Sequence, residues 1–298
     1  MTLPKLKIVL ILIILFLILI LVFIFGQDLK PQVARKPLSM SGEQLESYFN
    51  NKNEYEESFA KYTTMAKIHV LAATTSHHFL AKDLIAQTFS GIDPVGILSV
   101  IIVSPDHFKQ IDKPGIYAQT TDTEWKTPFG NIKSDENTIN QLLKDKQVAL
   151  GVNLFRQEHG IYTLIPFIKR ALPNSKIVPL VLKQSNNYQY FYGLGKKLSE
   201  ISGLKNSLLV ISSDYSHNVA VEKAKLNDQK SISLLPNKNL DDVKSITNDC
   251  LQCTAFLFGY LKNTDTDFKL IYNNNSFDLS HQNPEDVTSY VGSYFVAK

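Results

Sequence analysis

Residues 8–25 form an unbroken apolar run that begins directly after Lys7 and contains no polar side chain. A run of about 18 residues or more can cross a bilayer core of roughly 30 Å as a helix, and in lipid the helix satisfies every backbone polar group. A cleaved signal peptide has a shorter apolar region, of about 7–15 residues, and a small-residue cleavage site. Residues 26–29 offer no good site of that kind. A buried core helix would show a polar face, and this run has none at any period. The pattern therefore predicts one uncleaved transmembrane anchor over residues 1–26.

A polar segment over residues 27–67 follows the anchor and is interpreted as a juxtamembrane stalk. Two basic residues precede the apolar run and three follow it closely, so the charges that set membrane orientation nearly balance. Because the N-terminal tail is very short and basic, we expect it to remain in the cytoplasm. The chain is thus predicted to be a single-pass membrane protein whose large domain lies outside the cytoplasm.

From Ile68 onward, short apolar runs rich in β-branched residues alternate with longer amphipathic stretches. This alternation predicts an α/β domain over residues 68–298, with a mixed or mostly parallel central sheet flanked by helices. The predicted strands are Ile68–Ala73, Ile97–Val103, Lys176–Leu182, Ser207–Ile211, Phe268–Tyr272 and Thr288–Phe295. The predicted helices are His78–Phe89, Asp135–Lys144, Ile161–Ala171, Phe191–Ile201, Val221–Leu234 and Thr254–Leu261.

The composition excludes two classes of protein. The net charge is +3, from 31 basic and 28 acidic residues, and no basic stripe is present, so a nucleic-acid partner is not expected. Two cysteines in 298 residues exclude a disulfide-dense secreted scaffold. The remaining residues suit one large domain or two small ones.

Histidines fall at strand ends or at the start of a helix in four separate segments. In an open α/β sheet, ligands bind beyond the carboxyl ends of the strands, and histidine is both the commonest metal ligand and an acid–base group near neutral pH. Each histidine alone is an ordinary loop residue, but their repetition at strand ends predicts a site. They are His77 and His78, His107, His159 and His217.

Carboxylates accompany two of these histidines. Glu158 directly precedes His159, and Asp214 lies three residues before His217. A carboxylate can orient an imidazole through its second nitrogen, although an Asp in a Ser-Asp-Tyr-Ser segment is equally suited to capping a turn. A serine triad built from Ser212 and His217 is disfavoured, because the glycines of a nucleophile elbow are absent.

The two cysteines, Cys250 and Cys253, form a single C-x-x-C sequence. Such a pair is compatible with a redox couple, with half of a zinc site, or with two structural thiols at the start of a helix. A four-cysteine zinc site is excluded because two cysteines are missing, but histidines could complete a mixed one.

Several short blocks, taken in order from about His69 to the C-terminus, resemble the Memo family, whose bacterial members are also called AmmeMemoRadiSam system protein B. Each block is unspecific alone, and their order carries the resemblance. The blocks are His77-His78-Phe79-Leu80-Ala81, Ser104-Pro105-Asp106-His107, Trp125-Lys126-Thr127-Pro128-Phe129-Gly130, Glu158-His159-Gly160-Ile161, Lys176-Ile177-Val178-Pro179, Ser212-Ser213-Asp214-Tyr215-Ser216-His217, Cys250 and Tyr290-Val291-Gly292.

The resemblance implies a fold like that of the class III extradiol dioxygenases, which are non-haem iron enzymes. It also implies a metal site made of His77, His107 and Cys250, for which iron or copper is expected and zinc is a third candidate. The catalytic residues implied around the metal are His217, Asp214, His159 and Glu158.

Several positions depart from the family pattern, and they lie beside the implied site rather than in it. These departures put the substrate and the activity in doubt more than metal binding. They are Ser76 in place of a proline, Asp106 in place of a small or amide residue, Tyr162 and Leu164 in place of polar residues, and Leu251 in place of a glycine.

Three functions follow as hypotheses. The first is a membrane-anchored, metal-dependent oxidoreductase. The second is a non-catalytic module that binds a peptide or small molecule in the same cleft, because a fold does not fix a function. The third is a structural membrane protein with a vestigial pocket.

Overall fold

The computed structural model describes residues 44–298 of the chain. The predicted anchor, and the predicted stalk up to residue 43, lie outside the described residues. Among the described helices, none is long and apolar enough to cross a membrane.

The centre of the domain is an eight-stranded mixed sheet with the strand order β6-β4-β7-β3-β8-β2-β10-β9. The inner strands β7, β3, β8 and β2 are parallel to one another. Strand β4 runs antiparallel to β7, and β10 runs antiparallel to both β2 and β9. The bounds are β2 Ala72–Thr75, β3 Ser99–Pro105, β4 Ala118–Thr120, β6 Val148–Leu150, β7 Lys176–Leu182, β8 Ser207–Ser212, β9 Thr266–Asn275 and β10 Ser289–Ala297.

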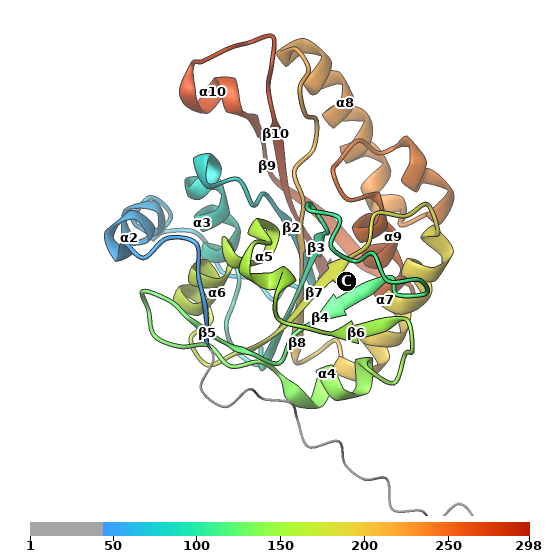
Figure 1. The fold of residues 1–298 in the computed structure, drawn as a ribbon. Helices are drawn as coiled ribbons and strands as arrows, with labels where there is room; N and C mark the ends of the chain where they lie inside the picture. Colours follow the sequence, from blue (N-terminus) through green and yellow to red (C-terminus); the bar gives the residue numbers. More distant parts are fainter. Residues whose placement is uncertain (1–43) are drawn as a thin grey trace, which may run out of the picture. The chain divides into compact units, whose positions relative to one another are not determined.

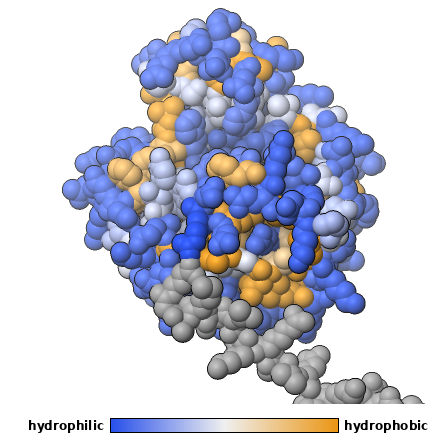
Figure 2. Space-filling view, in the orientation of Figure 1, coloured by the Kyte–Doolittle hydropathy of each residue, from blue (hydrophilic) through white to orange (hydrophobic). Residues whose placement is uncertain are grey.

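Helices cover both faces of this sheet, as Figure 1 shows. Side chains alternate between the two faces along a strand, so Ile101 and Val103 of β3 join one buried cluster while Val100 and Ile102 join the other. The face shown in Figure 2 is mostly hydrophilic with separated apolar patches, as expected for helices that bury one side. The helices are α2 Lys52–Ala60, α3 Lys82–Ser90, α4 Glu136–Leu142, α5 His159–Tyr162, α6 Ile165–Ala171, α7 Tyr188–Ser202, α8 Val221–Leu234, α9 Leu251–Tyr260 and α10 Ser276–Ser280.

The predicted mixed α/β architecture is confirmed, although the predicted helix over Ile161–Ala171 is divided into α5 and α6 and the longest strand, β9, extends beyond its predicted bounds at both ends. Strand β7 and helix α8 have the predicted bounds. The prediction omitted β4, β6 and β5 (Glu124–Lys126), because strands of three residues are too short to show a periodic pattern.

The described part of the predicted stalk packs onto the domain. Strand β1 (Gln44–Glu46) pairs with β5 in a separate two-stranded sheet, and Leu45, Tyr55 and Phe59 are buried in the cluster beneath β3. These apolar residues stand among many charged ones, so the sequence pattern did not reveal that they anchor the segment.

Helix α8 is joined to the sheet through a buried carboxylate. Asp228 accepts a hydrogen bond from Ser289 Oγ at 2.8 Å, and Ser289 Oγ in turn accepts one from the backbone N–H of Ser216 at 2.8 Å. This chain of contacts fixes the loop that follows β8. Burial raises the pKa of Asp228 to about 6, although the hydrogen bond from Ser289 opposes the shift.

Asp228 should therefore make the stability depend on pH. In the unfolded chain it ionises near 3.8, whereas in the folded protein it stays protonated up to about 6, so its ionisation costs stability above that pH. The free energy of unfolding should fall by on the order of 1–3 kcal/mol as pH rises from about 4 to 7. Asp228→Asn should remove this component and be the more stable protein at about pH 8. Urea unfolding of both proteins across this range measures the difference, and parallel pH profiles would contradict the assignment.

Candidate metal centre

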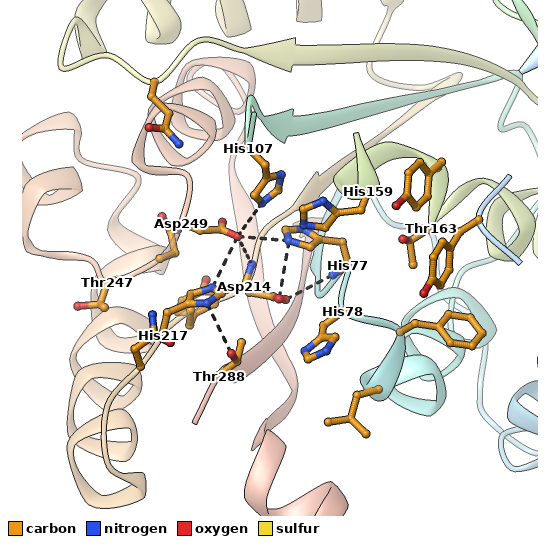
Figure 3. A pocket seen from close by; sticks show the side chains of 18 residues that line it. His77, His78, His107, His159, Thr163, Asp214, His217, Thr247, Asp249 and Thr288 are labelled. Atoms are coloured by element: carbon orange, nitrogen blue, oxygen red, sulfur yellow. Dashed lines mark hydrogen bonds and ion pairs between the residues drawn. The ribbon is translucent and has the colours of Figure 1, made fainter. Parts of the chain in front are cut away.

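A cavity of about 1030 Å³ opens beyond the carboxyl ends of the parallel strands. Figure 3 shows its histidines and carboxylates pointing toward one another from separate segments. The loops after β2, β3 and β8, the start of α5 and the segment before α9 all contribute. The polar floor consists of His77, His107, His159, Asp214, His217 and Asp249.

His77 follows β2 and is buried, with both ring nitrogens engaged. Its Nδ1 lies 3.0 Å from Ser212 Oγ, at the end of the neighbouring strand β8. Its Nε2 lies 3.3 Å from Asp249 Oδ2 and 3.7 Å from Asp214 Oδ2. The ring is thus held from one side, and its Nε2 points to two carboxylates.

His107 follows β3 and is fixed by Glu158. The Nδ1 atom lies 2.6 Å from Glu158 Oε1, and the backbone N–H of His107 donates to Glu158 Oε2 at 3.1 Å. The Nε2 atom lies 3.6 Å from Asp249 Oδ2. Glu158 is fully buried and does not line the cavity, so in this structure it positions His107.

Gly160 packs closely against Ser104 of β3, and this packing allows Glu158 to reach His107. A Cβ atom at residue 160 would lie 1.9 Å from Ser104 Oγ, so only glycine fits between α5 and β3. The Gly160 N–H donates to Glu158 Oε1 at 2.9 Å, and its carbonyl accepts from Ser212 Oγ at 2.5 Å. Helix α5 is therefore fixed against both β3 and β8, and it brings His159 to the site.

Asp249 is the point on which the imidazoles converge. Its Oδ2 lies 3.3 Å from His77 Nε2, 3.6 Å from His107 Nε2 and 3.9 Å from His217 Nε2. These contacts fan out from Asp249 in Figure 3. The carboxylate also accepts hydrogen bonds from Ser213 Oγ at 2.9 Å and from the Asp214 N–H at 3.2 Å.

These contacts set the pKa values of the site in the absence of metal. Burial alone would lower the pKa of His77 and of His107, but the neighbouring carboxylates outweigh it; the pKa of His77 is raised, and that of His107 is raised to about 10. Burial would raise the pKa of Asp249, but the contacts with His107 and His77 hold it well below its usual range.

The pKa of His159, unlike those of His77 and His107, is lowered. Burial first, and then the charges of His77 and His107, lower its pKa to about 4. Its ring centroid lies 3.9 Å from that of His107 and 5.0 Å from that of His77. His159 is therefore the neutral imidazole of the group and has a free lone pair at neutral pH.

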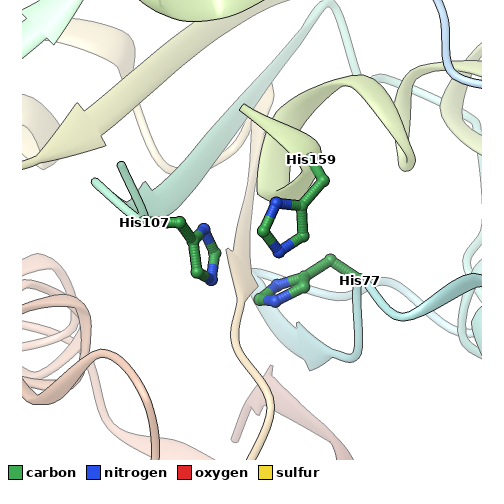
Figure 4. A group of neighbouring side chains, drawn as sticks. All are labelled: His77, His107 and His159. Carbon is green, nitrogen blue, oxygen red and sulfur yellow. The ribbon is translucent and has the colours of Figure 1, made fainter. Parts of the chain in front are cut away.

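Two sets of side chains have donor atoms close enough to share one ion. The atoms of His77, His107 and His159 lie within 4.8 Å of one another, and so do those of His77, Asp214 and Asp249. Figure 4 shows the three imidazoles of the first set facing one another. Imidazole and carboxylate groups are suitable ligands for transition metals, so the residues present fit a metal centre.

Cys250, the third metal ligand implied by the resemblance, lies directly after Asp249. It is oxidised and is not a free thiol. It is joined to Cys253 by a disulfide, and both residues are fully buried. Its sulfur belongs to neither of the two sets of donor atoms. A disulfide sulfur is not the thiolate that binds metals, so a ligand role for Cys250 stays a prediction that requires the reduced protein.

Asp249 is the site residue that the sequence reasoning missed. It lies in an irregular segment before α9, with no strand end or neighbouring histidine to mark it. The signal available was its position beside Cys250. The structure also places His78 at the cavity, with Nδ1 2.7 Å from the Tyr290 hydroxyl.

Comparisons with known proteins show the family to which the chain belongs. The model of the family described as "Memo-like protein" matches residues 41–292. A "MEMO1 family protein" of Caldivirga maquilingensis is 33% identical over 140 residues, which cover 46% of this chain and 48% of that protein. Another from Aquifex aeolicus is 28% identical over 158 residues, covering 52% and 57%. The chain thus spans about half the length of these relatives.

Among solved structures, "uncharacterized protein JW3007" from Escherichia coli K12 shows 10% identity and a TM-score of 0.47, and it covers 74% of this chain and 98% of its own. A likeness this weak carries no argument about the site. The family model, by contrast, matches most of the sequence, and it includes every residue of the site described above. The chain belongs to the Memo family.

Proposed function

We propose that the cavity binds one transition-metal ion through His77 and His107, and that the protein is a metal-dependent oxidoreductase. One observation carries this proposal. The Nε2 atoms of both histidines face the same carboxylate oxygen, while their Nδ1 atoms are held by Ser212 and Glu158. Metal-ligating histidines in proteins are oriented in this manner, through a hydrogen bond at the second ring nitrogen.

The donor set favours iron or copper, with zinc as a third candidate, and argues against magnesium and calcium, which prefer oxygen ligands. A bound iron or copper ion would supply redox chemistry to the cavity. A fold like that of the class III extradiol dioxygenases is part of this proposal. It is supported by a site at the carboxyl ends of the parallel strands.

The other polar residues suit distinct roles around the metal. His159 lines the cavity with its ring centroid 3.9 Å from that of His107, so it is placed to exchange a proton with a bound molecule. His217 is half-exposed at the cavity and is the second acid–base candidate. Asp214 accepts the backbone N–H of His77 at 3.4 Å and lines the cavity beside the metal-facing nitrogen of that ring.

A second candidate function, ligand binding without turnover, is favoured by an aromatic wall in the same cavity. Tyr48 stacks on Tyr162 with ring centroids 5.3 Å apart, and Phe79 meets Tyr48 edge-on at 5.5 Å. All three line the cavity, and Tyr48 is 51% exposed. An apolar wall beside a few polar groups is typical of small-molecule sites. Metal-loaded protein that binds phenols without taking up oxygen would favour this function over an oxidoreductase.

Metal titration of the full-length chain tests the site. Fe(II) and Cu(II) should bind to the wild type, and His77→Ala and His107→Ala should each raise the Kd roughly 10-fold or more, since even an outer partner typically contributes 10–100-fold. His69→Ala, which removes an exposed histidine outside the cavity, should bind like the wild type. Isothermal titration calorimetry measures all four proteins. Equal affinity in all of them, or binding in none, would refute the metal centre.

We further propose that residues 1–26 anchor the protein in a membrane, with the domain outside the cytoplasm. The proposal is supported by the apolar run at residues 8–25. The full-length chain should stay in the membrane pellet after an alkaline carbonate wash, whereas a chain that starts at Met40 should be recovered in the supernatant. Release of the full-length chain by carbonate would contradict the anchor.

A further inference from the structure

The segment directly before α9 contains two candidates for the third metal ligand, Asp249 and Cys250. We infer that Asp249, and not Cys250, completes the ligand set of His77 and His107 while the Cys250–Cys253 disulfide is closed. This inference rests on the proposed metal centre and concerns which side chains of this chain form it.

Cys250 is unavailable in the structure for a chemical reason. A cysteine binds a metal as the thiolate, and here the sulfur is bonded to that of Cys253. The Cys250 sulfur also accepts the backbone N–H of Cys253 at 3.2 Å, within the first turn of α9. Cys250 is the N-cap residue of α9 and Cys253 lies in its first turn, so the disulfide is part of the start of this helix. Both cysteines are fully buried.

Asp249 approaches the Nε2 atoms of both histidines, and with His77 and Asp214 it forms one of the two sets of donor atoms close enough to share an ion. Its Oδ1 accepts the hydrogen bond from Ser213 Oγ, and its backbone N–H donates to the Asp214 carbonyl at 3.0 Å. These contacts fix the carboxylate and leave Oδ2 facing the Nε2 atoms of His77 and His107. A carboxylate held in this way by outer hydrogen bonds is an oriented ligand.

The charges around the cavity also favour a cation at this point. Asp249 and Asp214 both line it, and Glu158 lies directly behind His107. Among the described residues that line the cavity there is no lysine or arginine. Imidazoles are therefore the only basic groups in the lining, and a bound metal ion would balance the carboxylates after the histidines lose their protons.

Asp214 is the other carboxylate that could be the third ligand, and its distances to the histidines differ from those of Asp249. Its Oδ2 lies 3.7 Å from His77 Nε2. Asp249 Oδ2 approaches both His77 and His107. The structure thus assigns Asp249 as ligand and Asp214 as the neighbour that accepts the backbone N–H of His77.

The ligand set decides the class of metal. Two imidazoles and one carboxylate with open positions are the arrangement of non-haem Fe(II) sites, whereas a thiolate would shift the preference toward Cu(I) or zinc. We therefore expect Fe(II) to be the metal of the disulfide-closed protein.

Co(II) is a suitable probe, because a cobalt–thiolate bond gives an intense near-ultraviolet charge-transfer band that nitrogen and oxygen ligands do not give. Alkylation followed by mass spectrometry first establishes that the disulfide of the purified full-length chain is closed. Wild type should then bind Co(II) without this band. Asp249→Asn should raise the Kd for Co(II) roughly 10-fold or more, and Asp249→Glu should recover part of the affinity.

The double variant Cys250→Ser/Cys253→Ser is the matched test of the thiol. It should bind Co(II) within about threefold of wild type, since it removes no ligand; circular dichroism confirms that each variant is folded. An open Cys250–Cys253 pair whose thiolate gives the cobalt band, or an Asp249→Asn variant with wild-type affinity, would overturn the assignment of Asp249 and leave the metal centre standing. Failure of the wild type to bind Co(II) and Fe(II) would instead refute the metal centre itself.

Discussion

One carboxylate oxygen, Oδ2 of Asp249, lies 3.3 Å from His77 Nε2, 3.6 Å from His107 Nε2 and 3.9 Å from His217 Nε2. Burying charged groups is costly unless each is paired and hydrogen-bonded. The site meets this requirement by surrounding its carboxylates with imidazoles. In the metal-free protein the neighbouring carboxylates raise the pKa of His77, and they raise that of His107 to about 10, which favours the protonated form of these two imidazoles. A metal ion can take the place of those protons and keep the same charges paired, so the arrangement that stabilises the empty site also prepares it for a cation.

The fold serves this arrangement by bringing distant segments to one edge of the sheet. Parallel strands β2, β3 and β8 end side by side, and each is followed by a polar site residue. The close contact at Gly160 allows Glu158 to reach His107, and the same short helix supplies His159. The apolar clusters on both faces of the sheet hold these strand ends in place. The rigidity of the core therefore determines the distances at the site.

The sequence revealed the parts of the site that follow a regular element. His77 and His107 could be predicted because each follows an apolar run that is recognisable as a strand, and parallel neighbours end at the same edge. Asp249 could not, because it lies in an irregular segment and is brought to the histidines by tertiary packing alone. The resemblance to a known family drew attention to Cys250 instead, one residue away. The sequence left the state of the two cysteines open, and the structure has them as a disulfide.

The same limit applies to the fold. The mixed sheet and its long elements were predictable, whereas the short strands β4, β5 and β6 were not, because their pairing depends on partners far along the chain. Leu45 and Tyr55 show the effect most clearly, since they lie in a charged segment and are nevertheless fully buried.

The most direct test of the central claim is a crystal structure of the protein loaded with Fe(II), with diffraction data collected on both sides of the iron absorption edge. The account predicts a single anomalous peak bonded to His77 Nε2, His107 Nε2 and a carboxylate oxygen of Asp249, with the Cys250 sulfur still joined to Cys253. A peak bonded to the Cys250 sulfur, or no peak in this cavity, would contradict it.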